Sequence, residues 1–264
     1  MAAKLPPDLW TFRRTIRKSG KLGCSRCYSI KGELMSIDIE KYLIDLESSD
    51  EEISSSDIDT LCGLAESSDS LVRSRVASLL ADHYDERSVD ALLKLADDSN
   101  RLVRTEAADS LYIAKSQEVF DKLADLAQND PYYLVRGYAV MSLFYVYINM
   151  YGESMSAEQG LLKTLLEYYE KEDDDWVLVS YYKTFYECGD KTFFQNLIDS
   201  MTNPEPDIRG ITVQAFMDIL SSENKQIIKD TVFYYYQNED DGLVRPKMEE
   251  LLNYIDKYEW EDEG

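Results

Sequence analysis

The chain is poor in the residues that interrupt helices. Its 264 residues include only 11 Gly and 6 Pro, and few of these lie inside apolar segments. Because both residues destabilise a helix interior, their scarcity predicts an all-α chain.

Cysteine and long apolar runs are also scarce. Four cysteines, two of them isolated at Cys62 and Cys188, do not make a disulfide framework in a chain of this length. The longest uncharged apolar stretch, residues 137–151, is about 15 residues long, whereas a membrane-spanning helix needs about 20. The N-terminus has basic residues but lacks the apolar core of a signal peptide. We therefore expect a cytoplasmic protein with no membrane partner.

Basic residues are outnumbered by acidic ones. There are 28 Lys and Arg against 51 Asp and Glu, which gives a formal net charge of -23. This charge repels nucleic acid and anionic membranes over most of the surface. A basic protein partner and simple solubility both agree with it.

Signatures of catalysis, cofactor binding and metal binding are missing. The single histidine, His83, stands at the expected end of a helix, where it suits the negative helix terminus. Cys24 and Cys27 form one CxxC without a second pair. No nucleophile elbow, GxGxxG loop or Walker motif occurs, and the acidic runs 173–175 and 239–241 lack the ligand spacing of a calcium loop. We expect a protein that is not an enzyme and has no cofactor.

What the sequence does contain is a repeat. A short acidic or polar stretch runs into an apolar pair and a basic residue at 67–73 (SSDSLVR), 98–104 (DSNRLVR), 130–136 (DPYYLVR), 203–209 (NPEPDIR) and 239–245 (EDDGLVR). A degenerate copy at 174–180 (DDWVLVS) places Ser180 where the others have arginine. The final residues are about 30 to 45 positions apart, a period typical of stacked helical repeats.

Each copy predicts one antiparallel helix pair. Apolar residues after the motif recur at helical spacing, as in Val135, Ala139 and Leu143. The helix that follows each motif is the second helix of its pair. The first helices precede the motifs, at 58–65, 89–96, 119–127, 161–169, 193–201 and 227–236. An initial helix at 37–46 would cover the apolar face of the first pair. The expected architecture is an α-solenoid of about six helix pairs.

This pattern resembles the HEAT-repeat family, especially the short repeats of phycobilin lyases, over residues 53–258. The resemblance implies a structural ladder between neighbouring repeats, formed by Arg73, Asp98, Arg104, Asp130, Arg136, Arg209 and Arg245. Ser180 would be unable to make the ladder contact. The longer link between pairs three and four predicts a bend or hinge at 150–160.

The N-terminal segment has the opposite charge to the rest of the chain. Residues 1–34 carry eight Lys and Arg against two Asp and Glu, a net +6, whereas residues 35–264 carry 20 against 49, a net -29. Residues 31–33 can be encoded by a purine run resembling a bacterial ribosome-binding site. We expect a bacterial protein whose native start is Met35, with a disordered tail or a nucleic-acid-binding arm as the alternatives for residues 1–34.

The remaining signal is aromatic. Sixteen of the 20 tyrosines lie between residues 132 and 258, and tyrosine suits protein interfaces. With the last motif residue as position 0, positions +2, +5 and +9 lie opposite the buried face of each second helix. The resemblance places these helices on the concave side of the solenoid. The predicted partner-binding residues are Tyr138, Met141, Tyr145, Tyr182, Phe185, Ile211, Glu106, Asp109, Asp218 and Glu250.

These residues form an aromatic centre with acidic flanks, as in a protein interface. The prediction is a non-catalytic module that binds a basic protein partner in its groove, acting as an inhibitor or immunity-type protein. Two alternatives stay open. Tyr138, Tyr182 and Phe185 could be buried between repeats, or the region from Tyr138 to Phe185 could handle a small aromatic ligand, as in bilin-lyase-type proteins. Nothing in the sequence indicates the oligomeric state.

Overall fold

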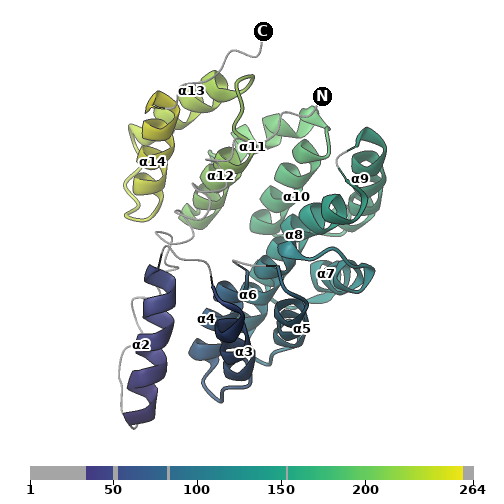
Figure 1. The fold of residues 1–264 in the computed structure, drawn as a ribbon. Helices are drawn as coiled ribbons and strands as arrows, with labels where there is room; N and C mark the ends of the chain where they lie inside the picture. Colours follow the sequence, from purple (N-terminus) through teal and green to yellow (C-terminus); the bar gives the residue numbers. More distant parts are fainter. Residues whose placement is uncertain (1–33, 50–52, 82–83, 153, 258–264) are drawn as a thin grey trace. The chain divides into compact units, whose positions relative to one another are not determined.

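The computed structural model describes residues 34–49, 53–81, 84–152 and 154–257. The basic segment 1–33, with Cys24 and Cys27, lies outside the described residues, and so does His83. Within the described ranges the chain forms thirteen α-helices and two short 3-10 helices, with no strand (Figure 1). The all-α class expected from the sequence is confirmed. No helix of this described part is both long and apolar enough to cross a membrane.

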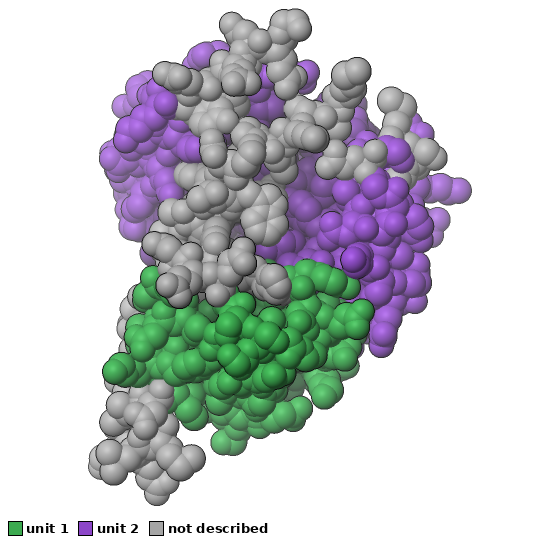
Figure 2. Space-filling view, viewed as in Figure 1, with its two compact units in different colours: residues 1–110 green, residues 111–264 purple. Residues whose placement is uncertain are grey.

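The chain divides into two compact units, residues 1–110 and 111–264 (Figure 2). The helices of unit 1 are α2 (Leu34–Ser48), α3 (Ser55–Leu64), α4 (Ser70–Leu80), α5 (Glu86–Leu95) and α6 (Arg101–Ser110). Unit 2 begins with η1 (Leu111–Ile113), α7 (Gln117–Asn129), α8 (Tyr133–Tyr151), α9 (Met155–Tyr169) and α10 (Asp175–Glu187). It continues with η2 (Lys191–Phe193), α11 (Phe194–Ser200), α12 (Pro206–Ile219), α13 (Lys225–Tyr236) and α14 (Val244–Lys257).

Most of these helices begin at a short polar side chain. Ser54 forms a capping box with Asp57 at the start of α3, and Asp69, Ser116 and Asp174 each accept a hydrogen bond from a backbone amide in the first turn of α4, α7 and α10. Such caps satisfy amides that have no partner inside the helix. The Ser, Asp and Asn clusters of the sequence therefore divide the chain into helix pairs.

The core lies between the two helices of each pair and between neighbouring pairs. Val135, Ala139 and Leu143 of α8 are fully buried, as their spacing predicts. In unit 1, α4 packs on α6. In unit 2 the second helices lie side by side in the order α8, α10, α12 and α14 (Figure 1). This is the pair-stacking pattern of an α-solenoid.

Helix α2 packs against the first pair, as expected for the initial helix. Leu43 is fully buried. Arg75 of α4 donates two hydrogen bonds to Glu47 of α2, from Nε to Oε1 at 2.8 Å and from Nη2 to Oε2 at 2.9 Å. Tyr42 of α2 also donates to Asp57 of α3 at 2.9 Å.

The segment 150–160 forms helix ends rather than a long loop. Helix α8 continues to Tyr151, Gly152 turns the chain with a φ of 77°, and α9 begins at Met155. Positive φ is strained for residues with a Cβ, which explains glycine here. The extra residues of this repeat therefore lengthen α8 and α9. The boundary between the compact units falls elsewhere, at residues 110 and 111, and a hinge at 150–160 stays a prediction.

Candidate functional site

The helix starts define one common numbering for all six second helices. In five of them the N-cap carbonyl, and in α14 the Asp241 carbonyl three residues before the helix, accepts a hydrogen bond from the amide four residues later; the residue of that amide is position 0. These amides belong to Arg73, Arg104, Arg136, Leu178, Arg209 and Arg245. In five repeats this residue is the motif arginine, as the sequence predicts.

The fourth repeat corrects the sequence prediction. Its N-cap is Asp174, and the amide of Leu178 donates to the Asp174 carbonyl at 2.9 Å. Leu178 therefore occupies position 0, and Ser180 lies two residues further along α10. The motif of this repeat is EDDDWVL at 172–178, with Glu172 six residues before position 0. Two residues correspond to about 200° around a helix, so the error places every later side chain of α10 on the wrong face.

The motif arginines share one local hydrogen bond. In all five, Nη1 donates to the carbonyl oxygen six residues earlier, at 2.7 to 3.2 Å; the donors are Arg73, Arg104, Arg136, Arg209 and Arg245. The arginine thus holds the loop that joins the two helices of its own pair. This structural role agrees with the ladder that the resemblance implies.

Three of these arginines also form a bidentate ion pair with a carboxylate of the next repeat. Arg73 donates from Nε and Nη2 to Asp98 at 2.6 and 2.9 Å. Arg136 makes the same contact with Glu172 at 2.8 and 2.9 Å, and Arg209 with Glu239 at 2.6 and 2.8 Å. Each acceptor is the residue six before position 0 of the following helix. Glu172 and Glu239 were not predicted from the sequence, although a carboxylate six residues before position 0 was a usable signal.

These ion pairs shift the ionisation of the acceptors. Hydrogen bonds from Arg73 and Arg209 hold the pKa of Asp98 and of Glu239 below the usual range, against an opposing effect of burial. Burial raises the pKa of Glu172, but hydrogen bonds from Arg136 and from two backbone amides outweigh it, so that this pKa is lowered as well. All three carboxylates are therefore ionised at neutral pH.

The remaining rungs of the ladder differ. Arg104 belongs to unit 1 and its expected partner, Asp130, to unit 2, so that pair stays a prediction. Arg245 lies over the ring of Tyr236, 4.2 Å from its centroid. In the fourth repeat both partners are neutral, because Leu178 replaces the arginine and Asn203, 25 residues later, replaces the carboxylate.

The corrected numbering changes which side chains of α10 lie opposite the first helices. Tyr182 stacks on Phe193 of η2 and contacts Tyr169 of α9, and burial raises its pKa to about 12. Phe185 is fully buried against Tyr169 and Phe193. Both contact the first-helix layer. The burial of Phe185 corrects its prediction as a partner-binding residue, whereas Tyr182 is partly exposed and its role stays a prediction. The residues at positions -2, +2, +5 and +9 are instead Trp176, Ser180, Lys183 and Glu187.

We call the residues at these four positions of α8, α10, α12 and α14 the second-helix face of unit 2. They are Leu134, Tyr138, Met141 and Tyr145 of α8; Trp176, Ser180, Lys183 and Glu187 of α10; Asp207, Ile211, Gln214 and Asp218 of α12; and Leu243, Lys247, Glu250 and Tyr254 at α14.

A buried lysine links three helices of this face. The side chain of Lys183 is 1% exposed, and its Nζ lies 2.8 Å from Glu187 and 3.5 Å from Asp218 of α12. Tyr145 of α8 donates to Glu187 at 3.1 Å, and Nζ lies 3.4 Å from the Tyr145 hydroxyl. Lys183 and Glu187 were not among the residues predicted from the sequence. With position 0 at Leu178, Lys183 is the only cation at position +5 of the six second helices, and this was the usable signal.

The fourth repeat also brings two helices unusually close. A Cβ at Gly137 of α8 would lie 2.6 Å from Cε3 of Trp176 and 2.8 Å from Oγ of Ser180. Tyr138 packs its ring on Trp176, with centroids 5.2 Å apart. Trp176 and Ser180 thus fill the place where α10 meets α8.

The other predicted partner-binding residues divide by burial. Met141 is 9% and Ile211 7% exposed, so these two supply core packing and little contact area; this too corrects the prediction. Tyr138, Tyr145, Asp218 and Glu250 are partly exposed on the second-helix face of unit 2, while Glu106 and Asp109 are partly exposed on α6 of unit 1. Burial raises the pKa of Glu250 despite nearby Lys247.

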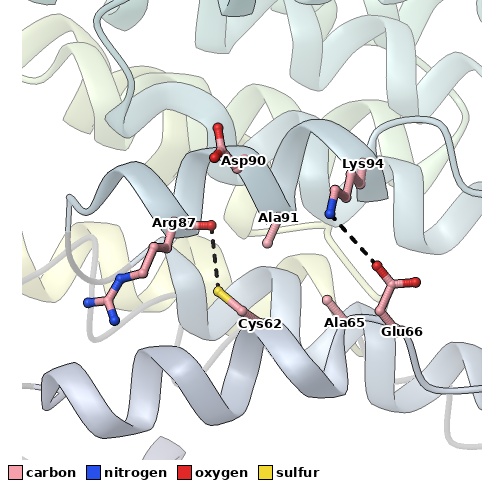
Figure 3. Close-up of a pocket in the computed structure, with 7 residues that line it drawn as sticks. All are labelled: Cys62, Ala65, Glu66, Arg87, Asp90, Ala91 and Lys94. Atoms are coloured by element: carbon pink, nitrogen blue, oxygen red, sulfur yellow. Dashed lines mark hydrogen bonds and ion pairs between the residues drawn. The ribbon is translucent and has the colours of Figure 1, made fainter.

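A small depression of about 180 Å³ lies between α3 and α5 of unit 1 (Figure 3). Cys62 points into it and its thiol donates to the Arg87 carbonyl at 3.5 Å, while Glu66 and Lys94 approach each other across the opening at 4.0 Å. Burial raises the pKa of Cys62, so its thiol is protonated and weakly nucleophilic at neutral pH. No cluster of three metal-ligating side chains occurs in the described part of the chain.

Comparison with known proteins identifies the repeats. Residues 58–143 match the family model of HEAT repeats. No curated protein matches the chain. The HEAT-repeat family expected from the sequence is therefore confirmed for residues 58–143, whereas the phycobilin-lyase subtype stays a prediction.

Proposed function

Because the chain contains HEAT repeats, we propose that it is a non-catalytic module that binds a basic protein segment on the second-helix face of unit 2. HEAT repeats are commonly protein-interaction modules. The observation that carries the proposal is the composition of this face. Tyr138 and Tyr145 are partly exposed; Tyr145 donates to Glu187, and Lys183 joins Glu187 to the carboxylate of Asp218.

Each class of residue has a separate task in this proposal. Tyr138 and Tyr145 supply rigid contact area with a polar end, as interface tyrosines do. Asp207, Asp218 and Glu250 give the face an excess of acidic over basic charge, since Lys183 and Lys247 are the cations at these positions. Acidic groups around a contact surface steer a basic partner and speed its association.

An enzyme-associated role in handling a small aromatic ligand is less well supported. The region from Tyr138 to Phe185 is occupied by ring contacts, with Tyr138 on Trp176 at 5.2 Å and Tyr169 on Phe185 at 5.4 Å. A ligand there would have to displace these rings. A role as an inhibitor or immunity-type protein rests on the charge of -23 alone.

The experiment is an affinity capture from the native host with the full chain as bait, followed by mass spectrometry and binding kinetics of the recovered partner.

Tyr138→Ala with Tyr145→Ala should raise the dissociation rate at least about 10-fold, because interface tyrosines often carry much of the binding energy. Tyr151→Ala is the control, since Tyr151 is 56% exposed on the same helix but lies outside the face.

Acidic residues are tested by association rates at low and physiological salt. Asp207→Asn with Glu250→Gln should slow association and weaken its salt dependence, whereas Asp121→Asn, exposed on first helix α7, should change neither. A partner that binds all these variants with wild-type kinetics would show that another surface carries the contact.

A further inference from the structure

Helix α13 differs from the other first helices in what it exposes. In α3, α5, α7, α9 and α11, every exposed residue that the structure describes is polar or glycine. Helix α13 instead exposes three large apolar or aromatic side chains: Ile227 is 51% exposed, Phe233 55% and Tyr234 70%. Scattered single apolar residues are ordinary on a surface, but a group on one helix indicates an interaction site.

The exposed residues lie away from the side that packs in the core. Ile228 and Val232 of α13 are fully buried, and α13 packs on α14. Ile227 and Tyr234, seven residues apart, share one flank of the helix, and Phe233 lies about 100° around the helix from Tyr234. We call Ile227, Phe233 and Tyr234 the α13 face. It extends over about two turns, or roughly 10 Å.

The charges beside the α13 face are acidic. Glu223 and Asp240 are exposed just before and just after the helix, and Asp230 is exposed between Ile227 and Tyr234. Of the two lysines of α13, Lys229 is paired with Asp256 of α14, and Lys225 also has an interaction partner. An apolar strip with an acidic border complements an apolar strip with a basic border.

We propose that the α13 face is a docking site for a short amphipathic helix of another protein, whose apolar stripe is flanked by Lys or Arg. Partner helices use anchors at i, i+3, i+4 and i+7, which matches an apolar strip two turns long. A second copy of this chain is a poorer fit, because it brings the same acidic border and the same net charge of -23. This site is separate from the second-helix face of unit 2, so the module would hold two partners or two parts of one partner.

The test uses the full chain and a fluorescent synthetic helix of leucine and lysine with one apolar stripe. Comparison peptides are a scrambled version of the same composition and a helix with glutamate in place of lysine. The leucine–lysine helix should bind the wild-type chain most tightly. Ile227→Gln with Tyr234→Gln should weaken it at least about 10-fold, because both apolar anchors are lost. Gln226→Ser, an exposed neighbour on the same helix, should change affinity less than about twofold, since it removes no anchor.

Three outcomes would overturn the proposal. The first is equal affinity for the wild type and the Ile227→Gln, Tyr234→Gln variant; the second is binding of the scrambled peptide as tight as that of the amphipathic helix. The third is a wild-type dimer in analytical ultracentrifugation that this variant converts to a monomer, because the occupant would then be a second copy. The Tyr138→Ala, Tyr145→Ala variant should bind the helix normally, which separates this test from that of the proposed function.

Discussion

Gly137 shows how a single hydrogen atom in place of a methyl group permits close packing of two helices. Alanine here would place its Cβ against Trp176, which is only 6% exposed and has no room to move. We expect Gly137→Ala to lower the free energy of unfolding by about 1 to 3 kcal/mol, the usual cost of overpacking. The measurement is chemical denaturation.

Gly63 provides the matched control. It also lies in a helix, α3, but an added Cβ meets nothing within 4 Å. Gly63→Ala should therefore stabilise the protein by up to about 1 kcal/mol through helix propensity alone. Equal effects of the two substitutions would contradict the packing of Gly137 on Trp176.

Lys183 is the second residue whose environment leads to a prediction. Replacing it with methionine leaves the carboxylates of Glu187 and Asp218 close together without their cation. Removing one partner of a buried ion pair costs about 3 to 5 kcal/mol, whereas replacing both by apolar residues is often neutral. We therefore expect Lys183→Met to be less stable than the double variant Lys183→Met, Glu187→Leu. Chemical denaturation of the double variant and of Lys183→Met and Glu187→Leu alone is the measurement. If the double variant loses a free energy of unfolding equal to the sum of the two single losses, the residues are not coupled, which argues against this network.

At the scale of elements, the fourth repeat lacks one rung of the ladder, and the structure indicates how to restore it. Position 0 is Leu178 and the acceptor position is Asn203, with the same spacing of 25 residues that separates Arg73 from Asp98. In a double-mutant cycle, Leu178→Arg and Asn203→Asp should show a favourable coupling of about 1 to 2 kcal/mol in the free energy of unfolding.

The same experiment decides between the two possible alignments of α10. Ser180 is fully buried against Gly137, so Ser180→Arg should strongly destabilise the protein with or without Asn203→Asp. If Ser180→Arg were tolerated and coupled to Asn203→Asp while Leu178→Arg did not couple, position 0 would have to be Ser180 after all.

For the whole molecule, the ladder predicts a loss of stability in acid. Asp98, Glu172 and Glu239 have lowered pKa values in the folded protein. A carboxylate with a lowered folded pKa contributes stability that is present above its unfolded pKa, about 4, and is lost as the pH falls through the folded pKa. The contribution of these three sites to the free energy of unfolding should therefore decline between about pH 5 and pH 2.

The net charge of -23 acts in the other direction, because protonation of exposed carboxylates relieves repulsion. Comparison with Arg73→Met isolates the ladder contribution. Without its arginine, Asp98 loses the main cause of its lowered pKa, so the variant should lose less stability than the wild type between about pH 5 and pH 2. Identical pH dependence for the two proteins would show that the Arg73–Asp98 pair makes no net contribution.

Local chemistry in the sequence is enough to specify the helices, their pairing and the loop arginines. Caps at Ser and Asp, apolar residues at helical spacing, and an arginine that reaches a carbonyl six residues away each act within a few turns of chain. The fold class and the family could therefore be predicted from the amino-acid sequence alone. Arg73 and Asp98 lie where the ladder requires them.

Which side of α10 faces which neighbour depends instead on tertiary packing. The segment 176–180, WVLVS, has valines at both 177 and 179, so its apolar pattern fits two alignments that differ by about 200° of rotation. The cap at Asp174 and the contact of Trp176 with Gly137 select one of them. Burial of Phe185, Met141 and Ile211 likewise comes from the neighbouring helices, because exposure on a helical wheel depends on how closely the next helix approaches.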